Sequence, residues 1–201
     1  MVIEKAIWIY WCFCFLAAFL VISKRQFVYE LLSPASGASE HGKGYTVSLI
    51  LGWITTLLAG MGYVLLTHKS ETGSYQVLDL VTFALLNGTL EQFIFLVWFL
   101  FGCYLGRFVS NHPPGLIFWG GYLSYVCFSG CIHASFWTRI LPSHEPATGV
   151  MVLLLTAMSL VWMWLVWRYR ALNEIVAMHI VIDFLMIGHL NFPWFEAFQL
   201  R

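Results

Sequence analysis

Apolar residues form long continuous segments along this chain, and short polar segments separate them. The apolar segments lie near residues 3–23, 46–67, 77–105, 115–140, 149–167 and 173–190. A helix needs about 20 apolar residues to cross the hydrocarbon core of a bilayer. The segments between them contain residues that commonly interrupt helices, as in the Pro-, Ser- and Gly-rich stretch 33–44. The pattern predicts an all-α fold, a polytopic transmembrane helical bundle of about six spans.

The composition also indicates a membrane protein. Of the 201 residues, 60% are hydrophobic and only 10% are charged, and the mean hydropathy is +0.79. Soluble domains contain about 25% charged residues. Ten basic and ten acidic residues leave no basic stripe for nucleic acid, so we expect no nucleic-acid partner. We expect a single integral membrane domain over residues 1–201, a multi-pass protein embedded in the lipid bilayer.

The basic residues predict an orientation in the membrane. The positive-inside rule assigns the side with more Lys and Arg to the cytoplasm. With six spans, both termini are then outside the cytoplasm. Six basic residues are expected on the cytoplasmic side (Lys24, Arg25, Lys43, Arg107, Arg168 and Arg170) and four on the other (Lys5, Lys69, Arg139 and Arg201).

Glu91 is the only charged residue in the apolar stretch between residues 80 and 106. A charge at bilayer depth costs at least a few kcal/mol, so such a residue indicates a functional site. The surrounding segment is too long for one crossing and contains Asn87, Gly88 and Thr89. The helix either restarts at Thr89, which would place Glu91 in a first turn, or continues through this segment. The sequence fits both arrangements.

Two later apolar segments also carry residues with acid–base chemistry. His133 lies in one of them, and His179 and Asp183 lie in the other. His179 and Asp183 are spaced by one helical turn, so they share a helix face. Such a pair can fix a tautomer, donate to an oxyanion or bind a metal. For each residue alone, a buried structural hydrogen bond is also a sufficient explanation.

Three short motifs resemble those of one family of membrane proteases. Residues 88–96 resemble the motif G-x-x-E-E-x-x-F-R, residues 128–133 resemble F-x-x-x-H, and residues 172–183 resemble a final motif H-x-x-x-[ND]. These are the motifs of the CPBP family, the CAAX prenyl endopeptidases and bacteriocin-processing proteins, which are intramembrane glutamic proteases. The resemblance covers about residues 75–190 and implies a CPBP-like core there.

The resemblance implies an endopeptidase that needs no metal and no cofactor. Glu91 and His133 would activate water, and His179 and Asp183 would support the oxyanion. The substrate would be a membrane protein or a peptide cut at the membrane. Because an ionised Asp183 would repel an oxyanion, we expect it either to be protonated or to act by orienting His179.

Three positions depart from the family pattern. Gln92 stands in place of the second glutamate, Leu96 in place of the arginine, and Phe128 lies one residue early, so that Ser129 stands four residues before His133. Losing both members of an ion pair avoids a stranded buried charge. The departures favour a second hypothesis, a catalytically inactive CPBP-like protein. Such a protein would bind, stabilise or help assemble a membrane-protein partner in a stoichiometric complex.

Two further alternatives use the same residues. Imidazoles and carboxylates suit zinc or a non-haem metal, although the chain lacks the H-E-x-x-H spacing of zinc proteases. A transporter or proton path would also use buried ionisable groups, but the paired broken segments typical of transporters are missing from the sequence. We therefore favour the metal-independent protease over these two.

Overall fold

The computed structural model describes residues 2–32, 42–67, 77–109, 113–139 and 142–187. Regular structure in these residues is entirely helical, with no strand among them, so the predicted all-α fold is confirmed. The elements are α1 (Val2–Ser23), α2 (Arg25–Leu32), α3 (Lys43–Leu66), α4 (Val77–Val109), α5 (Pro114–Arg139), the 3-10 helix η1 (Pro142–Ala147), α6 (Thr148–Tyr169) and α7 (Leu172–Ile187).

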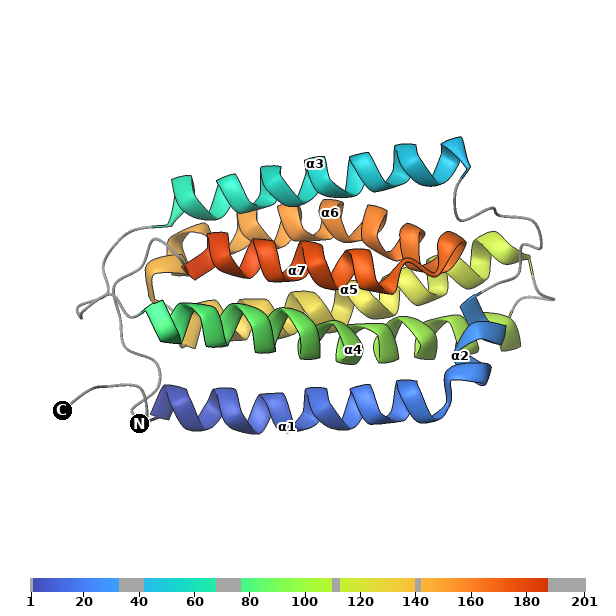
Figure 1. Cartoon of the computed structure of the whole chain (residues 1–201), viewed down its shortest axis with the longest axis horizontal. Coiled ribbons are helices and arrows are strands. Elements are labelled where there is room, and N and C mark those ends of the chain that lie inside the picture. Colours follow the sequence, from blue (N-terminus) through green and yellow to red (C-terminus); the bar gives the residue numbers. More distant parts are fainter. Residues whose placement is uncertain (1, 33–41, 68–76, 110–112, 140–141, 188–201) are drawn as a thin grey trace.

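The long helices run side by side along one axis of the molecule (Figure 1). Helix α4 is central, because it packs against α1, α5 and α7. Helix α3 packs against α6 and α7, and in the view of Figure 1 it lies at the edge opposite α1. Two short helices were not predicted: α2 follows α1 after a turn and contacts α4, and η1 connects α5 to α6.

Five described helical segments are long and apolar enough to cross a membrane, one each in α1, α3, α4, α5 and α6. The sixth predicted span corresponds to α7, which has 16 residues where it is described. At 1.5 Å per residue, that is about 24 Å, less than the hydrocarbon thickness of about 30 Å. Five of the about six predicted spans are therefore long and apolar enough to cross a membrane. Residues 188–190 of the predicted sixth span lie outside the described part.

Helix α4 is one uninterrupted helix of 33 residues. The alternative in which the helix restarts at Thr89 is therefore wrong, and Glu91 lies well inside the helix. A straight helix of this length measures about 50 Å. It exceeds the hydrocarbon thickness, so α4 must tilt or extend beyond it.

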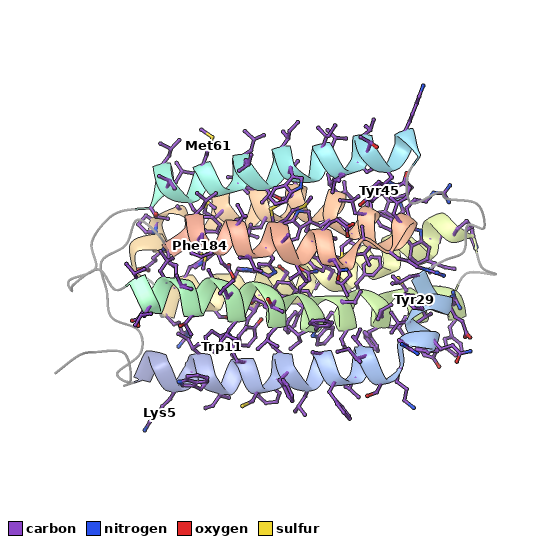
Figure 2. All side chains as sticks on the ribbon, viewed as in Figure 1. Lys5, Trp11, Tyr29, Tyr45, Met61 and Phe184 are labelled. Carbon is purple, nitrogen blue, oxygen red and sulfur yellow. The ribbon has the colours of Figure 1, made fainter. Side chains whose placement is uncertain are left out.

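Apolar side chains cover the outward faces of α1 and α3 (Figure 2). Phe15 on α1 is 63% exposed and Leu65 on α3 is 74% exposed. Soluble monomers rarely expose such extended apolar surfaces. In a bilayer these side chains contact lipid tails, while Glu91, His179 and Asp183 are buried in the interior.

The helix ends separate the basic residues as predicted. The end formed by the last turn of α1, by α2 and by the start of α3 carries Lys24, Arg25, Lys43, Arg107, Arg168 and Arg170, and we call it the basic end. The opposite end, which we call the Arg139 end, carries Lys5 and Arg139. Lys69 and Arg201 lie outside the described residues.

Gly88 allows α7 to approach α4 closely. A Cβ atom at this position would lie 2.6 Å from the backbone nitrogen of Ile180 and 2.7 Å from its Cα. Backbone atoms cannot move aside by a change of rotamer. Since Ile180 follows His179 in the chain, this close contact brings His179 against α4, beside Glu91.

We expect Gly88→Ala to lower the free energy of unfolding by about 1–3 kcal/mol, the usual cost of overpacking, because α4 and α7 must separate. The measurement is unfolding in detergent micelles, followed by circular dichroism. The matched control is Gly115→Ala on α5, where an added Cβ meets nothing within 4 Å. Alanine favours helix there, so the control should be neutral or slightly stabilising. Equal stabilities of the two variants would contradict the close contact.

Candidate active site

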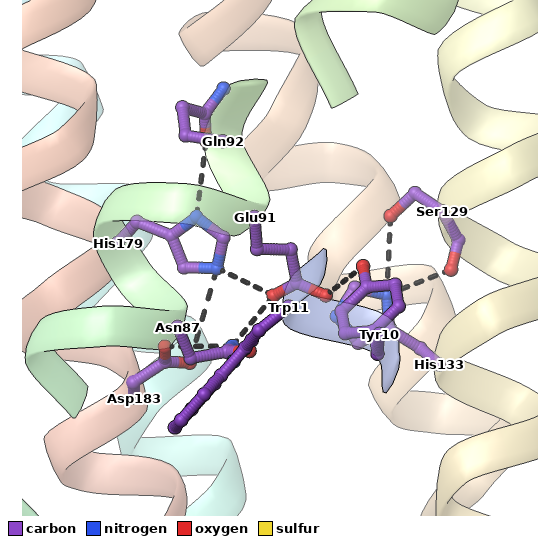
Figure 3. A network of polar contacts seen from close by, with 9 residues as sticks. All are labelled: Tyr10, Trp11, Asn87, Glu91, Gln92, Ser129, His133, His179 and Asp183. Atoms are coloured by element: carbon purple, nitrogen blue, oxygen red, sulfur yellow. Dashed lines mark hydrogen bonds and ion pairs between the residues drawn. The ribbon is translucent and has the colours of Figure 1, made fainter. Parts of the chain in front are cut away.

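Glu91, His179 and Asp183 meet in the interior between α4 and α7 (Figure 3). The Nε2 atom of His179 lies 3.1 Å from Oε2 of Glu91 and 3.9 Å from Oδ1 of Asp183. All three side chains are buried. The spacing of His179 and Asp183 places both on the face of α7 that packs against α4. Three of the four predicted residues therefore form one charged cluster.

Three donors surround the carboxylate of Glu91. The hydroxyl of Tyr10 donates to Oε1 at 2.5 Å, Nδ2 of Asn87 donates to Oε2 at 2.8 Å, and Nε2 of His179 lies 3.1 Å from the same oxygen. A carboxylate has about four lone-pair sites, so one site is left for water or substrate. These bonds explain how a buried acid is tolerated in an apolar bundle.

Asn87 connects the two carboxylates of the cluster. Its Nδ2 donates both to Glu91 and to Oδ2 of Asp183, the latter at 3.0 Å. Its Oδ1 accepts a hydrogen bond from Nε1 of Trp11 at 3.0 Å. The amide has two hydrogens, so each acid receives one. Asn87 thus holds two acidic groups close together by a neutral bridge.

His179 is bonded through both ring nitrogens. Its Nδ1 lies 3.1 Å from Oε1 of Gln92, and because an amide oxygen only accepts, Nδ1 must carry a hydrogen. Its Nε2 faces the Glu91 carboxylate. With the amide in this orientation and Glu91 ionised, the ring donates from both nitrogens and carries a positive charge. Gln92, at the position of the family's second glutamate, therefore orients His179.

His133 lies on α5 and forms no hydrogen bond to Glu91 in the described part of the chain. Its Nδ1 lies 2.7 Å from the carbonyl oxygen of Ser129 and 3.2 Å from the Ser129 hydroxyl. A carbonyl oxygen only accepts, so Nδ1 carries a hydrogen, and in the neutral ring Nε2 is then unprotonated. That nitrogen can accept a proton.

One cavity of about 300 Å³ joins these groups. It is lined by all four predicted residues, Glu91, His133, His179 and Asp183, together with side chains that include Tyr10 and Asn87. This volume is at the lower end of the range for ligand sites and is far more than one water needs. The cavity also touches Ala6, Arg139 and Met186, which lie near the Arg139 end of the bundle.

Aromatic rings form the wall between the two histidines. Phe95 lies nearly parallel to His179, with ring centres 5.9 Å apart, and its ring centre is 5.7 Å from that of His133. Phe128 packs against the edge of Phe95 at 5.9 Å and stacks on Trp98 at 5.0 Å. Phe128 therefore supports this wall despite its shifted position in the motif. Leu96 is buried and makes no polar contact.

Sequence reasoning missed Tyr10, Trp11 and the bridging role of Asn87. The resemblance begins near residue 75, so it could not select residues of α1. Aromatic residues in an apolar segment normally indicate packing or anchoring at the interface. For Asn87 a signal was present, since a polar residue one turn before Glu91 shares its helix face.

We expect Asn87→Leu to destabilise the protein by about 2–5 kcal/mol, because both carboxylates and the Trp11 indole lose a buried partner. The measurement is the free energy of unfolding in micelles. Thr55→Val is the control, since Thr55 is half-buried and its hydroxyl bonds only to carbonyl oxygens of its own helix. If Asn87→Leu were as stable as this control, the bridge would contribute nothing.

Glu91, His179 and Asp183 are also the residues that could hold a metal ion. One ligand atom from each lies within 4.8 Å of the others, and His133 is not part of this group. A catalytic zinc needs ligand atoms about 2.0–2.2 Å from the ion. In this structure the same atoms are already bonded to Asn87, Tyr10 or one another, so an ion would have to displace these hydrogen bonds.

We expect the purified protein to contain no stoichiometric zinc, measured by elemental mass spectrometry, and to keep its unfolding midpoint in EDTA. The internal hydrogen bonds already satisfy the cluster, so removing trace metal should not destabilise it. A stoichiometric metal that Glu91→Gln removes would contradict this expectation and support the metal site.

Comparisons of the chain with family models, with curated proteins and with solved structures found no match. The resemblance to the CPBP family therefore stays a prediction.

Proposed function

We propose that this chain is a metal-independent intramembrane endopeptidase of the CPBP type, which hydrolyses a peptide bond at the membrane. The observation that supports it most is that the four side chains selected by the resemblance line one cavity. They come from α4, α5 and α7, which are far apart in the sequence. Their meeting inside an apolar bundle is what a hydrolytic site would require.

Water would be activated between Glu91 and His133. Glu91 has one lone-pair site left, and the unprotonated Nε2 of His133 is a second acceptor. A water bonded to both would lose a proton to one of them while its oxygen attacks the peptide carbonyl. The same proton is then given to the leaving nitrogen as the C–N bond breaks.

His179 and Asp183 would act on this step through Glu91. The His179 ring directly contacts the Glu91 carboxylate, so its first role is to orient that group and balance its charge. The oxyanion support implied by the family would then need a further donor. Tyr125 lines the same cavity, and its hydroxyl is a suitable donor, whereas the hydrogen of the Tyr10 hydroxyl is already donated to Glu91.

The second candidate is a catalytically inactive CPBP-like protein that binds a membrane-protein partner. Two observations favour it. The hydroxyl of Tyr10 already occupies Oε1 of Glu91, and in the view of Figure 3 its ring overlaps that of His133. A fully bonded polar network can also serve only to fix the packing of helices.

We expect Glu91→Gln and His133→Ala each to reduce cleavage at least about 100-fold, the usual contribution of a general base. New peptide termini would be compared by mass spectrometry in membranes containing the wild type or a variant at equal amounts. Glu145→Gln, an exposed charge on η1, is the control and should behave as the wild type.

Identical termini in wild type and both variants would contradict the protease. If a membrane protein also co-purified in stoichiometric amount with all of them, that result would support the inactive binding protein.

A further inference from the structure

A second cavity of about 300 Å³ lies at the basic end, and it shares no lining residue with the candidate active site. Helices α1, α2, α4, α6 and α7 and the connection after α6 contribute to it. Its floor is apolar and buried, and its rim is exposed and carries two arginines, Arg25 and Arg170. The buried floor residues are Val21, Val28, Leu32, Leu96 and Val166.

Neither rim arginine forms an ion pair with another described residue. Arg170 lies over the ring of Tyr29, with 4.7 Å between Cζ and the ring centre, and donates to the Tyr29 carbonyl oxygen at 3.3 Å. A guanidinium has five N–H donors, so most of them remain available. The side chain of Arg25 makes no hydrogen bond to another described residue. The rim therefore carries two positive charges that have no counter-ion among the described residues.

Neither of the described acidic groups near this cavity, Glu30 and Glu174, lines it. Glu174, in the first turn of α7, accepts a hydrogen bond from Tyr45 on α3 at 2.6 Å. Glu30 on α2 is exposed and does not line the cavity. The start of α7 at Leu172 adds the partial positive charge of a helix N-terminus to the same rim. The described residues that line the cavity thus carry two positive charges and no negative one.

The backbone of Arg170 fixes its place on the rim. Its φ of 56° is in the left-handed region, and it is the only non-glycine residue with positive φ among the described residues. This conformation ends α6 and turns the chain directly into α7. Arg170 and the start of α7 therefore lie at the same side of the cavity.

We propose that this cavity binds an anionic phospholipid, with the phosphate at Arg25 and Arg170 and an acyl chain on the apolar floor. The rim lies at the end that the positive-inside rule assigns to the cytoplasm. Anionic lipids attract arginines at that surface, and basic pockets between transmembrane helices bind their headgroups. The proposal does not depend on protease activity.

The test is native mass spectrometry of the full-length protein in detergent. Dioleoyl phosphatidylglycerol, dioleoyl phosphatidylcholine and inorganic phosphate are titrated separately. We expect the protein to retain phosphatidylglycerol, to bind phosphatidylcholine more weakly, and to bind phosphate alone too weakly to detect. Equal retention of the two lipids, or retention of phosphate alone, would overturn the proposal.

Two variants locate the site. We expect Arg25→Gln and Arg170→Asn each to weaken phosphatidylglycerol binding about fivefold, as for loss of one basic residue near an anionic surface. Asparagine is chosen at position 170 because it tolerates the left-handed conformation. The control is Arg168→Gln, which removes the same charge from the same helix end but outside this cavity. It should leave the affinity unchanged.

Arg25→Gln decides the outcome if Arg170→Asn fails to fold, because Arg170 also joins the end of α6 to α2. Unchanged phosphatidylglycerol affinity in Arg25→Gln, or an equal loss in Arg168→Gln, would overturn the proposal.

Discussion

A carboxylate buried in a bilayer must be both hydrogen-bonded and balanced in charge, and Glu91 imposes this constraint on the bundle. Leaving it unpaired would cost several kcal/mol. Its partners come from three helices: Tyr10 from α1, Asn87 from α4 itself and His179 from α7. The position of α1 against α4, and of α7 against α4, is therefore tied to one charged group rather than to apolar packing alone.

Much of the fold was predictable because the length of an apolar segment is set by the bilayer. The sequence left two arrangements open at Thr89, and the continuous helix is the one observed, because Gly88 serves the contact with α7 rather than a helix end. Glu91, His133, His179 and Asp183 could be selected since ionisable groups are costly in apolar segments. Tyr10 carries no such cost, and its part in the site depends on the rotation of α1.

Gln92 and Leu96, the two residues on α4 that depart from the CPBP motif, lie in different environments. Gln92 faces the cluster and bonds to His179, whereas Leu96 forms part of the floor of the basic-end cavity. A glutamate at position 92 would add a third carboxylate to the cluster, and an arginine at position 96 would put a cation under the apolar floor. Neutral residues at positions 92 and 96 therefore avoid both changes, although Nε2 of Gln92 is left without a partner among the described residues.

The active-site cavity extends toward only one end of the bundle. Its lining continues from Glu91 to Ala6, Arg139 and Met186 at the Arg139 end, while on the other side the buried rings of Phe95 and Phe99 close the interior. Water that enters along this route comes from one face of the membrane only. The cluster would then exchange protons with that aqueous compartment alone. Across a membrane that maintains a pH gradient, the protonation of Glu91 and His179 would follow the acidity of the compartment at the Arg139 end, whatever the acidity of the compartment at the basic end.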